Sequence, residues 1–393
     1  MHIFLNALAA SAGGGITYVR NVLPHFASHA EVQTSVALTP TLRNELEARP
    51  NIHFLEWDVP ARAALRLLFE QRRLPELIRQ QHADVLISAG NFALWNSPVP
   101  QILLSRSSLY TSNAFSNDLR KRRHYGLWFD TKLKSIFAAA SIRRADITVA
   151  PTAAFAEVLR SWTKIRMPER ILAIHHGFDA HAFCDSGELP SALADRLTKK
   201  AGTLRLLFVS HYNYYRNFAT LLRALPVIKT RLRERHVELL LTCNLTRPEH
   251  SASYRPSSEQ ALIEPLGIRS NVVELGAVPY TLLHSVYRSS DIYVTPAYTE
   301  TFAHPLVEAM ASALPIVASD LAVHREICGK AALYFQPFSA EDLATQVVRL
   351  GQDALKRQAL IEEGQRRVRD FSWSRHVDDL LALARGLMEK RSA

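Results

Sequence analysis

Short apolar segments alternate with helical segments along all 393 residues, and no other feature of the sequence restricts the fold as strongly. In the first half the strand-like segments are 2–5, 33–38, 52–57, 83–88, 101–105, 146–150 and 171–174. Between them, helical periodicity covers 16–27, 41–48, 62–81 (with Pro75 as a candidate break) and a segment from Ala153. Strands that alternate with helices at this spacing predict βαβ units and a mostly parallel sheet.

The second half repeats this architecture, without a repeat at the level of residues. Its strand-like segments are 204–209, 237–242, 271–275, 292–296, 316–319 and 332–335. Its helical segments are 218–231, 258–266, 281–288, those that start at 340 and 355, and 377–390. Because 393 residues suggest two domains, we expect an α/β protein with two doubly wound domains that face a central cleft. The expected boundaries are 1–180 for the N-terminal domain, 181–202 for a linker, 203–372 for the C-terminal domain and 373–393 for a final helix.

The chain is basic, with 47 Lys and Arg residues against 37 Asp and Glu and a formal charge of +10. This surplus favours an anionic partner such as a nucleotide, a nucleic acid or a membrane face, with a basic surface of no special role as the alternative. Cys184, Cys243 and Cys328 lie far apart, which disfavours a disulfide framework or a zinc site and favours a reducing compartment. We find neither a signal peptide nor an apolar run of ~20 residues, so we expect a cytoplasmic protein.

A basic stretch with interleaved aromatic residues lies between Asn117 and Arg144. Its apolar residues at helical spacing are Trp128, Phe129, Leu133, Ile136 and Phe137. One interpretation is a helix that contacts an anionic membrane surface, at the inner membrane face. The other is that the stripe belongs to the core and the charges form a solvated face. No known nucleic-acid-binding module surrounds the stretch, so we do not expect a nucleic acid as the partner.

Three glycines, Gly13, Gly14 and Gly15, precede the first helical segment. Glycines in this place allow a ligand to approach the backbone and leave amides free for an anion, although a flexible turn is the plain alternative. The pattern is not G-x-G-x-x-G, and no acid-bearing strand end follows at the usual distance. A dinucleotide-dependent dehydrogenase is therefore disfavoured.

Glu300 and Glu308 flank the start of a helical segment that follows the strand-like segment 292–296. Pro305 suits the first helical position, because it lacks a backbone donor and has a preset φ. Glu308 would then lie in the first turn, and the amides of 302–306 would point between the two acids. Such a place can hold a phosphate while carboxylates bind hydroxyl groups beside it. The pattern predicts a ligand in which a phosphate carries sugars.

Four motifs together resemble the retaining glycosyltransferases of family 4. The E-x-F-G-x-P-x-x-E-A-M-A segment of that family is matched by Glu300, Phe302, Pro305, Glu308 and Ala309-Met310-Ala311. Its L-G-x-V-P element is similar to Leu275-Gly276-Ala277-Val278-Pro279, and its I-P-x-G-V-D element to Ile174-His175-His176-Gly177-Phe178-Asp179. Its F-S-W element is similar to Phe371-Ser372-Trp373. The resemblance spans nearly the whole chain. It implies the GT-B fold of two Rossmann-like domains, with a last helix that returns to the N-terminal domain.

The resemblance also implies a nucleotide-diphosphate sugar as donor and assigns residues to it. Glu308 would bind the ribose hydroxyls, and Glu300 the hydroxyls of the donor sugar. The backbone of Phe302, Ala303 and His304 would line the phosphate and the sugar. The turn with Gly276, Val278 and Pro279 would lie near the base, and the loop with Gly14 and Gly15 would face developing negative charge.

The sequence departs from the family pattern at three places. Arg216 matches the Lys of the family's G-R-x4-K element, but His211 replaces its Arg, so neutralisation of the diphosphate would depend mainly on Arg216. Ala303-His304 stands where Gly-Leu is common. The N-terminal domain lacks the usual His after the strand 101–105, and Arg106 or Ser107 would have to fill that place.

These observations predict an enzyme that transfers a sugar to a hydroxyl of a saccharide or lipid-linked acceptor, in cell-surface polysaccharide or glycolipid synthesis. The chain contains no Asp-x-Asp, so we expect transfer without a metal and with retention of configuration, as the family resemblance implies. No cofactor is expected, because the nucleotide sugar is a substrate. The alternatives are a GT-B epimerase or phosphorylase, or a scaffold that binds nucleotide sugars without catalysis.

Overall fold

The computed structural model describes residues 1–10, 14–60, 63–184, 187–245 and 254–392. The chain divides into two compact units. Unit 1 comprises Met1–Thr111, Trp128–Gly177 and Ser372–Ala393, and unit 2 comprises Ser112–Leu127 and Phe178–Phe371. The segment Ser112–Leu127 thus belongs to unit 2, although it lies in sequence between two parts of unit 1.

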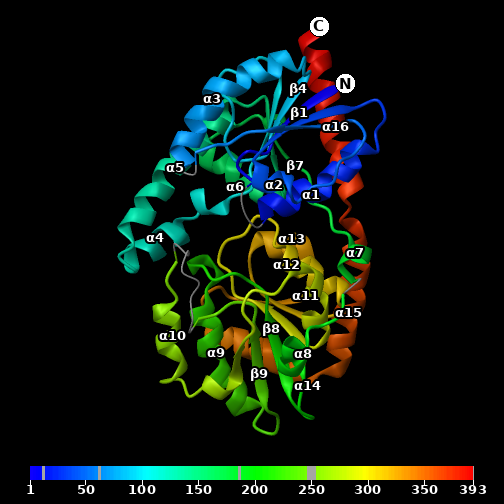
Figure 1. The fold of residues 1–393 in the computed structure, drawn as a ribbon. Helices are drawn as coiled ribbons and strands as arrows, with labels where there is room; N and C mark the ends of the chain where they lie inside the picture. Colours follow the sequence, from blue (N-terminus) through cyan, green and yellow to red (C-terminus); the bar gives the residue numbers. More distant parts are fainter. Residues whose placement is uncertain (11–13, 61–62, 185–186, 246–253, 393) are drawn as a thin grey trace. The chain divides into compact units, whose positions relative to one another are not determined.

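Unit 1 contains a seven-stranded sheet in the order β3-β2-β1-β4-β5-β6-β7, with every neighbouring pair parallel (Figure 1). The strands are β1 (His2–Asn6), β2 (Gln33–Leu38), β3 (Ile52–Glu56), β4 (Val85–Ser88), β5 (Gln101–Leu104), β6 (Ile147–Ala150) and β7 (Ile171–Ala173). Each predicted strand of the first half is present, with ends within two residues of the prediction. The α/β class is therefore confirmed for this half.

The helices of unit 1 are α1 (Gly14–Ala27), α2 (Pro40–Arg43), α3 (Ala63–Gln80), most of α5 (Tyr125–Arg144), α6 (Ala153–Thr163) and α16 (Trp373–Ser392). The prediction of a break at Pro75 is wrong, because α3 continues through this residue. Leu74 and Ile78 on either side of it are buried in the core, and their packing outweighs the one helical hydrogen bond that a proline removes. The helix predicted over 41–48 is limited to α2.

Alternate residues of the central strands pack on opposite faces of the sheet in unit 1. Ile3 and Leu5 of β1 belong to a core that includes Val377 and Leu381 of α16 and side chains of α1. Phe4, between them, belongs to a second core with residues of α3. Helices α1 and α16 therefore lie against one face of the sheet, and α3 covers the other.

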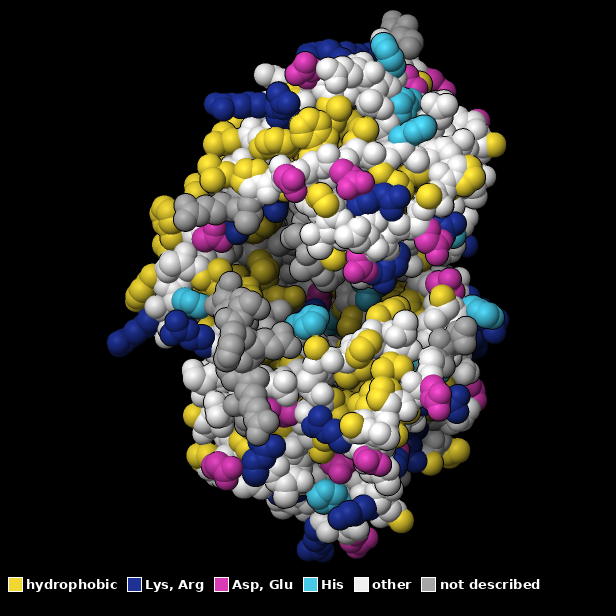
Figure 2. Space-filling model, in the orientation of Figure 1, with side chains coloured by type: hydrophobic (Ala, Val, Ile, Leu, Met, Phe, Trp, Pro, Cys, Tyr) yellow, Lys and Arg dark blue, Asp and Glu magenta, His cyan; other side chains and the backbone are white. Residues whose placement is uncertain are grey.

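Helix α5 exposes an apolar stripe to solvent. Phe129 and Ile136 are 66% and 65% exposed, and Leu133 is 40% exposed. Figure 2 shows hydrophobic side chains at the surface over α3 and α5, and Leu65 and Leu68 of α3 are exposed as well. The interpretation of the whole stripe as core is wrong, since only Trp128 and Phe137 are partly covered.

Unit 2 repeats the parallel architecture, with the strand order β10-β9-β8-β11-β12-β13. Its strands are β8 (Leu204–Phe208), β9 (Val237–Leu241), β10 (Val272–Glu274), β11 (Ile292–Thr295), β12 (Ile316–Ser319) and β13 (Ala332–Phe335). Its helices are α4 (Asn113–Lys121), α7 (Ala180–Cys184), α8 (Ser191–Leu197), α9 (Phe218–Arg231), α10 (Ser257–Ile263), α11 (Tyr280–Arg288), α12 (His304–Ala311), α13 (Ala322–Cys328), α14 (Ala340–Gln352) and α15 (Ala354–Arg367). The segment predicted as a linker contains α7 and α8.

Both sheets reverse their strand order at one place. In unit 1 the reversal lies between β1 and β4, and in unit 2 between β8 and β11. At such a place the connections of two neighbouring strands leave toward opposite faces, which opens a crevice at the carboxyl ends of the strands. Loops that follow these strands are therefore the first places to look for a ligand site.

Candidate functional site

Two loops meet at the reversal point of unit 2. One leads from β8 to the short 3-10 helix η3 (Tyr214–Arg216), and the other leads from β11 to α12. The side-chain amide of Asn217 donates to the carbonyl of Pro296 at 3.1 Å, and the backbone N–H of Tyr298 donates to the carbonyl of Tyr215 at 3.0 Å. These two hydrogen bonds tie the loops together.

The loops bring Arg216 and Glu300 into an ion pair. Nη1 of Arg216 donates to Oε1 of Glu300, and the two side chains are only 18% and 9% exposed. The guanidinium lies 4.8 Å from the ring centroid of Tyr215. Burial alone would lower the pKa of Arg216, but the charge of Glu300 outweighs it and raises the pKa above the ordinary value. Arg216 therefore remains a buried, permanent cation.

Helix α12 starts one residue earlier than the sequence predicts. Ala303 adopts a left-handed conformation with φ 64° and ψ 65°, and His304 is the first helical residue. Pro305 therefore takes the second helical position, and the prediction that it takes the first is wrong. Glu308 lies in the second turn instead of the first, where the field of the helix dipole is weaker.

Glu308 is buried, with 5% of its surface exposed. The hydroxyl of Tyr287, on α11, donates to its Oε2 at 2.8 Å. Burial raises the pKa of Glu308 to about 7, and the hydrogen bond from Tyr287 lowers it in part. This carboxyl group therefore gains its charge close to neutral pH.

Phe302 supports the loop from inside. Its ring is buried and packs edge-on against Phe371 at 5.5 Å, and it contacts the ring of His304 at 4.7 Å. The side chain of Phe302 is thus committed to the core, as expected if only the backbone of this loop meets a ligand.

Three buried polar atoms on loops and helices at this edge lack a hydrogen-bond partner within the described residues. They are Nε of Arg216, Oδ1 of Asn213 and Nε2 of His324. His324 is fully buried, its pKa is lowered by burial, and its Nδ1 lies 2.8 Å from the carbonyl of Ser319. Nδ1 therefore carries the proton, and Nε2 can accept a hydrogen bond. Because buried polar groups are almost always paired, a polar ligand is the natural partner for these atoms.

His324 has no place in the sequence motifs, and sequence reasoning missed it. Its electrostatic partners include Glu300 and Arg216, so the fold brings α13 to the same edge. His211, in contrast, was predicted as a site residue, and the structure leaves its side chain exposed after β8.

The turn after β10 requires a glycine. Gly276 has φ 77°, and a Cβ atom there would lie 3.2 Å from the side-chain nitrogen of Asn244. Val278 is half-buried, and the exposed Pro279 precedes α11. The three predicted residues of this turn thus follow the end of β10, the edge strand that pairs with β9.

At the corresponding edge of unit 1, the sequence predicts a loop that ends with three glycines and a helix that starts at Ile16. This prediction is wrong for Gly14 and Gly15, because α1 already begins at Gly14. Gly14 is the exposed first residue of α1, and Gly13 lies outside the described residues. A Cβ atom on Gly15 would come within 3.1 Å of the Cα of Ala10, which leaves little room for a side chain.

Arg106 follows β5 and is held on three sides. Its backbone N–H donates to Oδ1 of Asn91 at 2.6 Å, and its Nη2 donates to the carbonyl of Ala89. The guanidinium lies 4.3 Å from the ring centroid of Tyr18, which comes from α1. Burial lowers the pKa of Arg106, and contact with an aromatic face partly compensates a buried cation.

Tyr18 is fixed in turn by the last helix. Its hydroxyl lies 2.8 Å from Nε2 of His376, and Nδ1 of His376 lies 2.8 Å from the carbonyl of His175. Burial lowers the pKa of His376 to about 4, so the imidazole is neutral and accepts from Tyr18. Gly177 is required beside it, because a Cβ atom there would overlap the backbone of Trp373.

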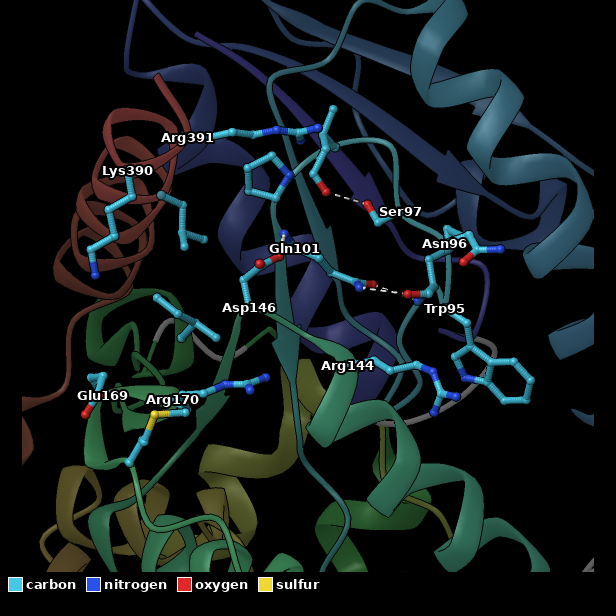
Figure 3. Close-up of a pocket in the computed structure, with 16 residues that line it drawn as sticks. Trp95, Asn96, Ser97, Gln101, Arg144, Asp146, Glu169, Arg170, Lys390 and Arg391 are labelled. Atoms are coloured by element: carbon cyan, nitrogen blue, oxygen red, sulfur yellow. Dashed lines mark hydrogen bonds between the residues drawn. The ribbon is translucent and has the colours of Figure 1, made fainter. Parts of the chain in front are cut away.

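A cavity of about 700 Å³ lies at the opposite, amino-terminal edge of the same sheet (Figure 3). Gln101, the first residue of β5, lines it, and its side chain bonds both backbone groups of Leu94. Cations surround the cavity: Arg144, Arg170, Lys390 and Arg391. Since Arg106 follows the other end of β5, this cavity is separate from the edge that contains Arg106 and the start of α1.

Solved structures of other proteins show which fold the chain has. Sucrose-phosphate synthase of Thermosynechococcus elongatus superposes with a TM-score of 0.79 at 18% identity, covering 99% of this chain and 100% of that chain. HepE of Anabaena, in complex with UDP and glucose, superposes with a TM-score of 0.71 at 16% identity, covering 98% and 100%. The chain therefore has the GT-B fold, as the sequence predicted.

The family follows from the sequence comparisons. The model described as Glycosyltransferase Family 4 matches residues 12–182, and the model described as Glycosyl transferases group 1 matches residues 192–367. The chain belongs to the family 4 type of glycosyltransferases.

Among curated relatives, the D-inositol 3-phosphate glycosyltransferase of Thermomonospora curvata is 27% identical over 235 residues. The match covers 58% of this chain and 54% of the relative, so the chain spans about half the length of this relative.

Proposed function

We propose that this protein transfers a sugar from a nucleotide-diphosphate sugar to a hydroxyl group of an acceptor. The observation that carries the proposal is the buried pair of Arg216 and Glu300 at the reversal point of unit 2. Three buried polar atoms at the same edge have no hydrogen-bond partner among the described residues. Membership in the family and the UDP and glucose bound to HepE, a protein with the same fold, support this choice.

Arg216 is the residue proposed to stabilise the leaving diphosphate. As the bond to the sugar breaks, negative charge develops on the β-phosphate, and a preorganised cation lowers the energy of that state. The planar guanidinium matches two phosphate oxygens, and its Nε is still without a partner in the described structure. Backbone amides at the start of α12 would add to this effect. This set of donors is why we propose transfer without a metal.

The two acids are proposed to hold hydroxyl groups. Glu300 would bind hydroxyls of the donor sugar while its other oxygen stays with Arg216, and Glu308 would bind those of the ribose. Ala303 and His304 would line the phosphate, and Gly276 would lie near the base. By family resemblance we propose that configuration is retained.

The test is to incubate the protein with UDP-, GDP- and dTDP-sugars, with and without sugar or inositol phosphate acceptors, and to measure release of the nucleotide. A thermal-shift screen of the same donors identifies the base, because a bound ligand stabilises the native state. NMR of the product then gives the anomeric configuration. Binding without release would support a scaffold instead, and no binding to any donor would refute the proposal.

We also propose that the acceptor is a saccharide or is linked to a lipid, and that α5 contacts an anionic membrane at the inner face. In the part of the chain that the structure describes, no helix has the length and apolarity needed to span a bilayer. The support for contact is the exposed stripe of Phe129, Leu133 and Ile136 beside exposed Lys132. Sedimentation with vesicles of phosphatidylglycerol and phosphatidylcholine should show binding that Ile136→Asp weakens and Val158→Asp, at an exposed site on α6, does not.

A further inference from the structure

The segment Ser112–Leu127 has an unusual position in the fold. In sequence it lies between β5 and β6 of unit 1, but it packs in unit 2. Helix α4 starts within it, where the hydroxyl of Ser112 accepts a hydrogen bond from the backbone N–H of Phe115. None of the family motifs includes this segment, and the proposed reaction so far assigns it no role.

Helix α4 contacts the loop that carries Glu300. The hydroxyl of Tyr298 donates to Oδ2 of Asp118 at 2.9 Å. Tyr298 lies two residues before Glu300, and its backbone N–H is the group that bonds the carbonyl of Tyr215. Asp118 therefore acts on the point at which the two site loops are joined.

The same helix holds the loop that carries Arg216. The ring of Phe115 is fully buried and packs edge-on against Tyr215, with 6.4 Å between the ring centroids. The other contact of the Tyr215 ring is the guanidinium of Arg216. Phe115 thus fixes the aromatic platform on which the proposed catalytic arginine lies.

A partly buried ionic network anchors α4 to unit 2. Arg122 bonds Oδ1 of Asp118 at 2.9 Å and Oε1 of Glu259 at 2.8 Å, and its guanidinium lies 4.2 Å from the ring centroid of Tyr214. Glu259 is almost fully buried and also accepts a hydrogen bond from the hydroxyl of Tyr212. Because the partners satisfy each other, breaking one contact would leave a buried charge, so the network holds α4 firmly.

We propose that Ser112–Leu127 is a positioning clasp for the donor site, which sets the distance between Arg216 and Glu300 by holding both of their loops. Residues on loops are placed less accurately than residues on strands and helices unless other groups support them. The clasp supplies this support from outside the βα unit that carries each residue. The expected effect of the clasp on the reaction rate rests on the proposed function. Its expected effect on the order of the two loops does not.

Two conservative variants test the clasp. Tyr298→Phe removes one hydroxyl and keeps the ring, which stacks on Phe338 at 5.1 Å. Asp118→Asn weakens the acceptor of the same bond and also removes the charge that pairs with Arg122. We expect Tyr298→Phe to lower kcat about tenfold, because a displaced site loop weakens transition-state stabilisation by about the strength of one hydrogen bond. Asp118→Asn should lower kcat further, because it also loosens α4. The affinity for UDP should stay within about twofold, and the double variant should lose little more than Asp118→Asn alone.

Tyr334→Phe, on β13, is the matched control. Its hydroxyl donates to the carbonyl of Gly329 at 2.7 Å and lies 3.5 Å from the carbonyl of His324, so its removal touches neither of the two site loops. The variant should lower stability to a similar extent and leave kcat unchanged. Amide hydrogen exchange gives a readout that needs no activity. Exchange in 211–217 and 297–303 should speed up in Tyr298→Phe but not in Tyr334→Phe.

Unchanged exchange in both loops would overturn the clasp, whether or not the protein transfers sugar. A kcat that falls equally in Tyr298→Phe and Tyr334→Phe would overturn it too, because the loss would then be a general effect of stability. If the wild-type protein turns over no donor while the loops respond as expected, the proposed function fails and the clasp stands.

Discussion

The carboxyl edges of the two sheets share a topology but differ in chemistry. In unit 2, Arg216, Glu300 and Glu308 gather at the reversal point, together with buried polar atoms that have no partner in the described structure. In unit 1, the predicted residues at the same edge are two glycines and Arg106, whose guanidinium lies on Tyr18 and whose Nε also lacks a partner among the described residues. The comparison shows that the strand order locates a site, while the side chains on the loops decide what the site binds.

This difference predicts a division of labour. Substitutions of Arg216 or Glu308, the unit 2 residues proposed to contact the nucleotide, should change binding of the nucleotide and the rate together. Substitutions at the edge of unit 1 should change the rate and leave nucleotide affinity almost unchanged. Variants at both edges test this division.

Arg216→Ala should have the largest effect. We expect kcat/KM for the donor to fall about 1,000-fold, because the variant loses the cation at the developing phosphate charge and leaves Glu300 buried alone. Arg216→Lys should restore part of the rate. Arg231→Ala is the control, since it breaks a more exposed ion pair between Arg231 of α9 and Glu341 of α14. Activity of Arg216→Ala within tenfold of the wild type would contradict its assigned role.

Arg106→Ala should lower kcat about 100-fold, because unit 1 then offers no cation among its predicted site residues. Isothermal titration should show UDP affinity within about twofold of the wild type. Tyr18→Phe keeps the ring under the guanidinium but loses the bond to His376, so it should cost less than tenfold in kcat. A large loss of UDP affinity in Arg106→Ala would end the proposed division between the units.

Glu308→Gln should change the pH dependence. The pKa of Glu308 is about 7 in the folded protein against an ordinary value of 4.5, so the stability it contributes is full below pH 4.5 and is lost as pH rises through 7. The difference corresponds to about 3 kcal/mol at pH 8. The Tm of the variant should therefore fall less than that of the wild type between pH 5 and pH 8.

The same variant tests the assignment of the ribose. In the wild type, UDP should bind more tightly as pH rises from 6 to 8 and the carboxylate forms. Glu308→Gln should bind UDP about tenfold more weakly at pH 8, with a flat pH profile. Identical pH profiles for both proteins would show that Glu308 does not titrate at the site.

Ala303→Gly should give the smallest change, in the stabilising direction. A left-handed conformation costs a residue with a Cβ atom about 1 kcal/mol, and a glycine removes this cost. We expect the free energy of unfolding to rise by up to about 1 kcal/mol in urea denaturation. Ala309→Gly, in the middle of α12, should lower it by a similar amount. A destabilised Ala303→Gly would indicate that the methyl group packs favourably.

Local patterns were sufficient for most of the fold. All strands were predicted from apolar runs, and the helix that starts near Pro305 was predicted from its proline and its periodicity. The errors occurred where tertiary packing outweighed a local rule. Helix α3 continues through Pro75 because its neighbours are buried, and the first helical residue is His304 because Ala303 takes a strained conformation.

The candidate site was predicted in part. Glu300, Glu308 and Arg216 lie where the motifs suggest, because every loop that follows a strand of a parallel sheet begins at the carboxyl edge of that sheet. His324 and Tyr287 were missed, since each reaches the site through burial and carries no local signal. His211 was predicted only from its place in the family's G-R-x4-K element, and its side chain is exposed in the structure.

The sequence alone determined the α/β class, the two series of strands and the stretch from Glu300 to Glu308, because periodicity and motif spacing act over a few residues. Only the tertiary structure decided that Ser112–Leu127 packs in unit 2, that Arg216 pairs with Glu300, and that burial raises the pKa of Glu308. Contacts between residues about 80 or more positions apart depend on how whole elements pack, and no local pattern encodes them.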